Sequence, residues 1–374
     1  MRERPLRGEW FTWKVPGGGV LYSDAATRDK GGLEMTRSTL AMLKVAVLAA
    51  AVLGATGSAQ TVVSGQSGQK RPGPPRTPWG DPELQGTWTT DDAIGVPIER
   101  PVQFGDKAFL SDQEFAERTR QDEAARQASL EEFVAPAAAA GGAVGPPGHW
   151  GERGSRTTRQ TSFVIDPPDG RIPPLTADAQ RRAASRDLGS FGTGPFNGPE
   201  DLTNYDRCIT RSVIGSIFPR PYGNGLRIVQ APGFVAITHE MIHDTRVISL
   251  DGRPHLGKNI QMYLGDSRGR WENGTLVVDT TNLTDRTSIG FNGNGLRHSP
   301  AMHLVERFTR TNAGTIQYDV TIDDPQTYTK PFRMAVPMTS QAGYQVFEYA
   351  CHEGNYGLPN ILSAARADEL AARK

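Results

Sequence analysis

The chain carries no excess of charge of either sign, since 41 Lys and Arg residues balance 41 Asp and Glu residues among its 374 positions. A balanced chain has no electrostatic attraction to nucleic acid or to an anionic membrane, so neither is expected as a partner. The length suits one large domain or two modest ones, with ample residues for a core. A small-molecule ligand is possible. The sequence does not predict the oligomeric state.

Apolar runs long enough to cross a membrane are also missing. The apolar run at residues 45–53 is about half of the ~20 residues that a membrane-spanning helix needs. Basic residues after Met35 precede this run, and small residues up to Ala59 follow it, which is the pattern of a secretory signal peptide over residues 35–59. We therefore expect cleavage before Gln60, a periplasmic or secreted protein and no transmembrane anchor. Residues 1–34 are then a mis-called upstream extension; the alternative is a genuine N-terminal tail with an internal apolar helix.

Cysteine is scarce, because only Cys208 and Cys351 occur. In the oxidising compartment that a signal peptide implies, a lone pair of cysteines is most simply one disulfide. On the chain-entropy account, closing so long a loop stabilises by about 4–5 kcal/mol. The alternative is a reactive thiolate or a thiolate metal ligand beside His352.

The usual signatures of the commonest enzyme classes are absent as well. The sequence contains no G-x-S-x-G string, P-loop, dinucleotide fingerprint, C-x-x-C-H haem-attachment string or EF-hand loop. The absence of these motifs argues against the commonest enzyme classes, but it does not exclude an enzyme with an unusual active site.

What the chain does have is a series of short strands separated by turn residues. Period-two patterns flank Pro232-Gly233 and Asn273-Gly274, and Asn-Gly is the strongest short-range hairpin signal. The expected strands are residues 161–166, 226–231, 234–238, 246–250, 269–271, 275–281, 302–311, 315–322, 332–338 and 345–351. About ten such strands predict a mainly β fold, an antiparallel meander that closes as a lipocalin-like barrel or folds as a sandwich.

The segments before these strands predict an accessory region. Residues 60–78 are rich in Gly, Ser, Gln and Pro, which is typical of a disordered leader. A capping box at residues 111–114 begins a charged surface helix that extends to about residue 130, and an Ala/Gly/Pro linker follows at 134–149. The predicted division is an accessory region at 79–156 and a β domain at 157–374, with short helices at 176–185 and 363–373.

Five strings occur in a fixed order over roughly residues 76–370. They are DPPDGRIPPL at 166–175, EMIHD at 240–244, LDGRPH at 250–255, GDSRGRW at 265–271 and YACHEGNY at 349–356. This set resembles a recurrent exported family of environmental bacteria whose function is uncharacterised. The resemblance implies export, and it carries over no catalytic role, ligand or cofactor.

Residues 239–243 read His-Glu-Met-Ile-His, the H-E-x-x-H string of zinc hydrolases. On a helix, His239 and His243 would hold one zinc ion and Glu240 would act as general base. The β-branched residues on both sides favour a strand instead, on which four residues span about 13 Å and the two imidazoles cannot share an ion. A further histidine at the extended spacing is also missing, because that position is Ser249. The prediction is a strand, with zinc-dependent hydrolysis as the alternative.

A strand at residues 239–243 would place His239, Met241 and His243 on one face. His303 and His352 lie at the ends of neighbouring predicted strands, and four imidazoles meeting in a cavity would suit Zn, Cu or haem. The alternative is a set of separate, hydrogen-bonded surface histidines.

Two loops place an aromatic ring before Asn, Gly and Arg. One runs from Tyr222 to Arg227, the second covers residues 291–297, and the segment around Tyr356 is a looser relative. Rings with amide and guanidinium donors suit a sugar or phenolic ligand, although Asn-Gly also serves any tight turn. We therefore expect an exported small-molecule-binding barrel with residues 239–243 and 351–357 at the wall of the site. The alternatives are the zinc hydrolase and a cell-envelope interaction protein without a small-molecule site.

Overall fold

A computed structural model describes residues 75–131, 151–152, 154–183 and 194–373. The expected upstream extension, the signal peptide, the Ala/Gly/Pro linker and most of the leader lie outside these ranges. The strands are β1 (Gly86–Thr89), β2 (Val164–Asp166), β3 (Leu226–Ala231), β4 (Phe234–His239), β5 (Thr245–Ser249), β6 (Asp266–Glu272), β7 (Thr275–Thr281), β8 (His303–Asn312), β9 (Thr315–Asp323) and β10 (Phe332–Ser340). The helices are α2 (Asp112–Glu131), α3 (Ala177–Arg182) and α4 (Gly357–Ala372).

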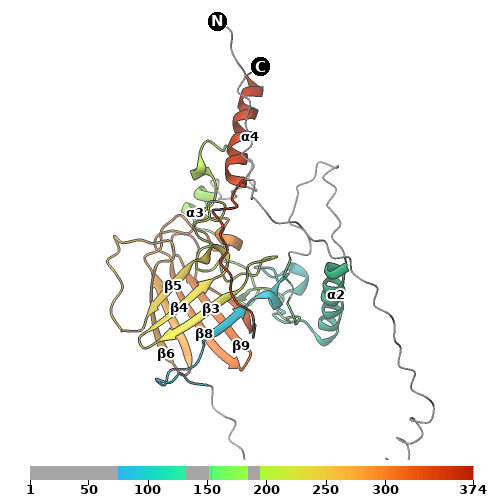
Figure 1. The fold of residues 1–374 in the computed structure, drawn as a ribbon, viewed down its shortest axis with the longest axis vertical. Coiled ribbons are helices and arrows are strands. Elements are labelled where there is room, and N and C mark those ends of the chain that lie inside the picture. Colours follow the sequence, from blue (N-terminus) through green and yellow to red (C-terminus); the bar gives the residue numbers. More distant parts are fainter. Residues whose placement is uncertain (1–74, 132–150, 153, 184–193, 374) are drawn as a thin grey trace, which may run out of the picture. The chain divides into compact units, whose positions relative to one another are not determined.

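Nine of these strands form a closed barrel, which confirms the predicted mainly β fold and decides for a barrel over a sandwich (Figure 1). The order is β1-β3-β4-β5-β6-β7-β8-β9-β10, and β1 closes the ring by pairing with β10 as well as with β3. β10 pairs with β1 near Ser340 and with the short strand β2 near Arg333, so two segments share one edge. The region predicted to be accessory thus contributes β1 to the barrel.

The hairpin turns follow from the turn residues. Asn273 and Gly274 join β6 to β7 with φ angles of 49° and 86°, as a two-residue hairpin turn with both central residues at positive φ requires. Glycine reaches this conformation freely and asparagine does so at little cost. The strongest hairpin signal in the sequence is therefore confirmed.

One pairing departs from the predicted antiparallel meander. β5 and β6 are parallel, with Ser249 opposite Arg268, whereas the other neighbouring barrel strands are antiparallel. Parallel neighbours cannot be joined by a tight turn, so the chain needs the long connection at residues 250–265. That connection carries residues of a cleft on the outside of the barrel.

Two further expectations need correction. Residues 345–351 were predicted to form a strand after β10, but they are irregular, and this segment instead leads into α4. Helix α4 begins at Gly357, six residues before the predicted start, and α3 ends at Arg182. The predicted surface helix is confirmed as α2, where the Ser111 N–H donates to Glu114 Oε2 at 2.8 Å and the Glu114 N–H donates back to Ser111 Oγ at 3.4 Å.

The barrel interior is packed with side chains. Alternate residues of each strand point inward and form one contiguous apolar cluster. Its largest fully buried members include Trp88, Phe308, Tyr318 and Phe332.

One ion pair lies inside this core. The Arg246 guanidinium donates to Glu306 Oε1 at 2.8 Å, and the exposed fractions of the two side chains are 7% and 0%. Tyr318 donates its hydroxyl to the same carboxylate oxygen at 3.1 Å. A buried ion pair of this kind is stable only while both charges are present and hydrogen-bonded, because a single buried charge without its partner is strongly unfavourable.

Arg246→Met should therefore destabilise the protein by about 3–5 kcal/mol, because Glu306 would stay buried without its cation. Urea unfolding followed by circular dichroism measures this loss. The double variant Arg246→Met/Glu306→Leu should recover much of it. Arg307→Met is the matched control, because Arg307 pairs with Glu272 in a solvent-exposed position and should cost no more than about 1 kcal/mol. Equal stability of Arg246→Met and the parent chain would contradict the account.

Candidate functional site

The H-E-x-x-H segment is neither the predicted strand nor a zinc-binding α-helix. Strand β4 ends at His239, and Met241–His243 form a single 3-10 turn in which Ile242 has a φ of 68°. The His239 N–H donates to the Asp244 carbonyl at 2.9 Å, so the chain reverses here into β5. The prediction of a strand through residue 243 is wrong because the chain must turn to pair β4 with β5.

This turn separates the two histidines and engages the glutamate. His239 is buried at the end of β4, whereas His243 is exposed. The Glu240 carboxylate accepts the Tyr344 hydroxyl at 2.7 and 2.9 Å and the Phe347 N–H at 3.0 Å. Glu240 therefore holds the segment that follows β10. Because its carboxylate oxygens are engaged in these hydrogen bonds, they are not positioned to act as a general base on a metal-bound water. Within the described ranges, no group of three His, Cys, Asp or Glu side chains is placed to hold a metal ion.

The four imidazoles considered together do not meet. His303 begins β8 and lies on the outward face, because inward positions alternate from Leu304 onward, whereas His239 belongs to the inward face of β4. His352 is exposed in the segment before α4. Of the two remaining loop candidates, Arg227 is an outward residue of β3 and Tyr356 is 73% exposed at the start of α4.

The first cleft lies beside the predicted disulfide, which is confirmed between Cys208 and Cys351 with a sequence separation of 143. Its volume is about 430 Å³. Its wall includes Tyr205, Asp206, Glu348, Tyr349, Leu358 and Ile361. Of the described residues that line it, none is Lys, Arg or His. We call it the disulfide cleft.

Two of the predicted site residues, Tyr222 and His243, lie next to the wall of the disulfide cleft. The Tyr222 hydroxyl lies near the hydroxyls of Tyr205 and Tyr349. Burial and the neighbouring Tyr222 hydroxyl raise the pKa of Tyr349. The His243 ring donates from Nδ1 to the Tyr349 carbonyl at 3.1 Å, which fixes this wall to the end of the β4–β5 turn. The contact is with Tyr349, two residues before the segment at 351–357 that was predicted to share a wall with residues 239–243.

Beneath this wall lies a buried guanidinium. Arg211 is 1% exposed and donates to the carbonyls of Gly223 and Phe218 at 3.1 and 3.4 Å. Burial lowers its pKa to about 10, while the nearby Tyr205 hydroxyl acts in the opposite direction. Arg211 therefore fixes two loop carbonyls under the cleft and is not exposed to a ligand.

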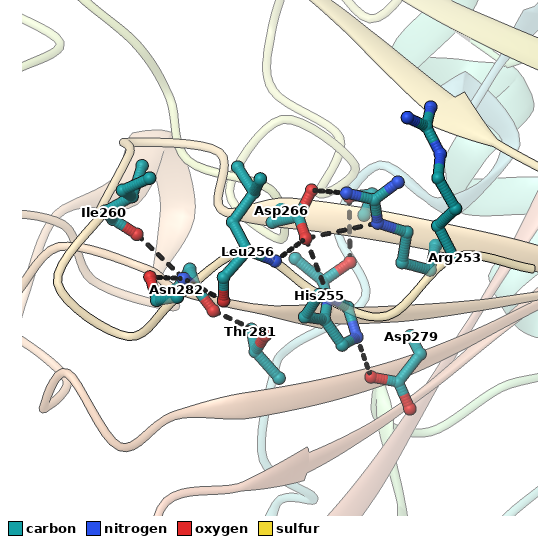
Figure 2. Close-up of polar contacts among 12 residues, drawn as sticks. Arg253, His255, Leu256, Ile260, Asp266, Asp279, Thr281 and Asn282 are labelled. Carbon is teal, nitrogen blue, oxygen red and sulfur yellow. Dashed lines mark hydrogen bonds and ion pairs between the residues drawn. The ribbon is translucent and has the colours of Figure 1, made fainter.

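A cluster of imidazoles and carboxylates forms on the outside of the barrel (Figure 2). His255, from the long β5–β6 connection, contacts Asp266 Oδ2 through Nδ1 and Asp279 Oδ1 through Nε2, each at 2.9 Å. His303 Nε2 contacts the same Asp279 oxygen at 3.0 Å. Arg268 lies on the far side of Asp266, with its NH2 group 3.1 Å from Oδ1.

Asp266 is held as a carboxylate by these contacts. Burial acts to raise its pKa, but the Leu256 N–H, the His255 ring and the Arg268 guanidinium together lower it. A cleft of about 580 Å³ opens beside the cluster, and its wall includes His255, Leu256, Lys258, Asn282, Met302 and His303. We call it the imidazole cleft.

His303 was predicted from the sequence as a site residue, whereas His255, Asp266 and Asp279 were not. Period two could have placed Asp279 on the outward face, because Leu276 and Val278 belong to the inward, apolar face of β7. The parallel β5–β6 pairing brings His255 to Asp279, and no local pattern encodes that pairing.

No protein-family model, curated protein or solved structure matches the chain. Among the described helices, none has the length and apolar character to cross a membrane. The functional conclusion therefore rests on the two clefts themselves.

His239 should make the protein sensitive to acid. Burial, with Arg246 and Arg211 nearby, lowers its pKa to about 3, whereas an unfolded histidine titrates near 6.5. The unfolded chain therefore binds a proton first, and stability present above about pH 6.5 is lost as the pH falls toward 3. Between about pH 7.5 and about pH 5 this group alone should remove about 2 kcal/mol of the unfolding free energy.

His239→Leu should abolish that part of the loss, as measured by urea unfolding at the two pH values. His352→Leu, at an exposed histidine, serves as the control and should leave the pH dependence unchanged. A His239→Leu protein that still loses as much stability as the parent chain would refute the assignment.

Proposed function

We propose that this protein is exported and binds a small organic cation in the disulfide cleft. The observation that carries the proposal is the composition of that cleft, in which two carboxylates and two tyrosine rings line a volume in the range of small-molecule sites. The packed core supports a cleft on the outside of the barrel over a cavity in its interior.

The charge of the cleft supports a cation. Asp206 and Glu348 line it, and no basic side chain among the described residues does so. Within the same part of the chain, Glu348 has no ion pair or hydrogen bond, so its carboxylate is available to a ligand. An anion would meet two like charges here and would be repelled.

The aromatic and apolar parts of the wall support an organic ligand over an inorganic ion. Tyr205 and Tyr349 supply rings, and an ammonium group beside a tyrosine ring gains about 0.5–1 kcal/mol at an exposed site. Leu358 and Ile361 supply apolar surface from α4. A cation with an apolar body would use both features.

Three features support the proposal of export. The signal-like segment at residues 35–59 lies outside the described residues, but the disulfide is of a kind that persists in oxidising compartments. The resemblance to an exported bacterial family points the same way. The proposed location is periplasmic or extracellular.

Three probes that share a benzyl or phenyl body test the ligand class: benzylamine, benzyl alcohol and benzoate. Titration calorimetry or NMR at about neutral pH should find that benzylamine, as its ammonium form, binds best in the disulfide cleft. Glu348→Gln should weaken that binding about two- to fivefold, because an exposed carboxylate contributes up to about 1 kcal/mol. Ala350→Trp should block it sterically.

Glu353→Gln is the matched control, since Glu353 is exposed five residues away and does not line the cleft. Equal binding of benzylamine and benzyl alcohol, or equal effects of the two Glu→Gln changes, would overturn the cation assignment. Failure of all three probes to bind would favour the alternative of an envelope interaction protein.

A further inference from the structure

We propose that the imidazole cleft is a second binding site, for a small carboxylate with an apolar body, in which Lys258 and His303 hold the carboxylate. This site differs from the disulfide cleft in position and in the sign of its charge. Four observations carry the inference.

The first is the fixed position of His255. Its Nδ1 lies 2.9 Å from Asp266 Oδ2, and its Nε2 lies 2.9 Å from Asp279 Oδ1. Both ring nitrogens are thus engaged, so His255 has none left for a ligand and instead links β6 to β7 at the edge of the cleft.

The second is the orientation of His303. Its Nε2 donates to Asp279 Oδ1, which leaves Nδ1 on the other side of the ring, without a partner in the part of the chain that the structure describes. The ring lines the cleft and its side chain is 38% exposed. Nδ1 is therefore the nitrogen that a ligand can reach.

The third is the charge balance. Arg268 pairs with Asp266, and the rings of His255 and His303 both contact Asp279, so both carboxylates already have partners within the cluster. Lys258 adds an exposed ammonium group to the wall, with no hydrogen bond or ion pair to any described residue. Of the described residues that line the cleft, none is Asp or Glu. The cleft thus has a positive charge available for an anion.

The fourth is the fixed shape of the wall. The Asn282 side-chain amide donates to the carbonyls of Leu256, Gly257 and Ile260 at 3.2, 2.9 and 2.8 Å, and the Asn282 carbonyl accepts the Met262 N–H at 2.9 Å (Figure 2). This side chain pins the connection that carries His255 and Lys258 against the end of β7. A wall held in place before binding loses less entropy when a ligand arrives.

Apolar side chains complete the site. Leu256 and Met302 line the cleft together with Pro300 and Ala301. A carboxylate with an aryl or branched alkyl body would place its charge near Lys258 and His303 and its body against these residues. A bare inorganic anion would leave that surface unused.

Benzoate is the probe, measured by NMR or calorimetry on the intact chain at about pH 6. Benzoate should bind, benzyl alcohol should bind at least fivefold more weakly, and benzylamine should not compete. Lys258→Gln and His303→Gln should each weaken benzoate binding about two- to fivefold. Ala301→Trp should block the site.

Two control variants test whether a loss of benzoate binding comes from the imidazole cleft. Lys330→Gln removes an exposed lysine outside the cleft, and His352→Gln removes an exposed histidine outside it. Both should bind benzoate as the parent chain does, and all variants should keep the parent circular dichroism spectrum. The proposal fails if benzoate and benzyl alcohol bind equally, if benzoate does not bind, or if Lys330→Gln weakens binding as much as Lys258→Gln.

The outcome is independent of the first site. Lys258→Gln should leave benzylamine binding unchanged, and Glu348→Gln should leave benzoate binding unchanged. A probe affected by both changes would mean that the two clefts do not act separately, which would also overturn this assignment.

Discussion

The parallel pairing of β5 with β6 is the constraint on which the outside of this barrel depends. Parallel neighbours must be joined by a long connection, and here residues 250–265 provide it. The connection lies against the end of β7, where Asn282 binds three of its carbonyls. In a strict meander, a short turn would replace it, and neither His255 nor Lys258 would lie beside His303.

The packed interior explains why both clefts are external. Most inward positions of the strands are apolar, a few such as His239 and the network of Arg246, Glu306 and Tyr318 are polar, and their side chains pack the interior. Outward positions are then the ones that can carry polar groups in reach of solvent, as Asp279 and His303 do. The barrel serves as a rigid support, and the irregular segments placed on it supply the chemistry.

Local patterns in the sequence were sufficient for most of the barrel. Alternation and Asn-Gly turns predicted β3, β4 and β7–β10 to within about two residues, because each hairpin is encoded by neighbours in the chain. The same reasoning failed at residues 345–351, where Glu240 and the disulfide, both distant in sequence, hold the chain in an irregular path. The disulfide was predictable because only two cysteines were present to pair.

The sites were less predictable than the strands. His243 contacts Tyr349, which was not among the predicted site residues, and the predicted pair His239 and His303 lie on opposite faces of the barrel. Whether an outward histidine has an acidic neighbour depends on strand order, and strand order around a parallel pair is not a local property. The H-E-x-x-H string is a second example. Its sequence suggests a catalytic glutamate, but in the structure Glu240 accepts the Tyr344 hydroxyl.

The disulfide has a topological consequence. The loop it closes contains β3 to β10, so β1 is the barrel strand that enters from outside the covalent ring. β1 is also held by few residues, with three partners on β3 and two on β10. Its departure would open the wall while every other barrel strand stayed inside the cross-linked loop. The cross-link therefore restrains eight of the nine barrel strands within one covalent ring and leaves β1 held to them by its backbone pairing and by the burial of Trp88.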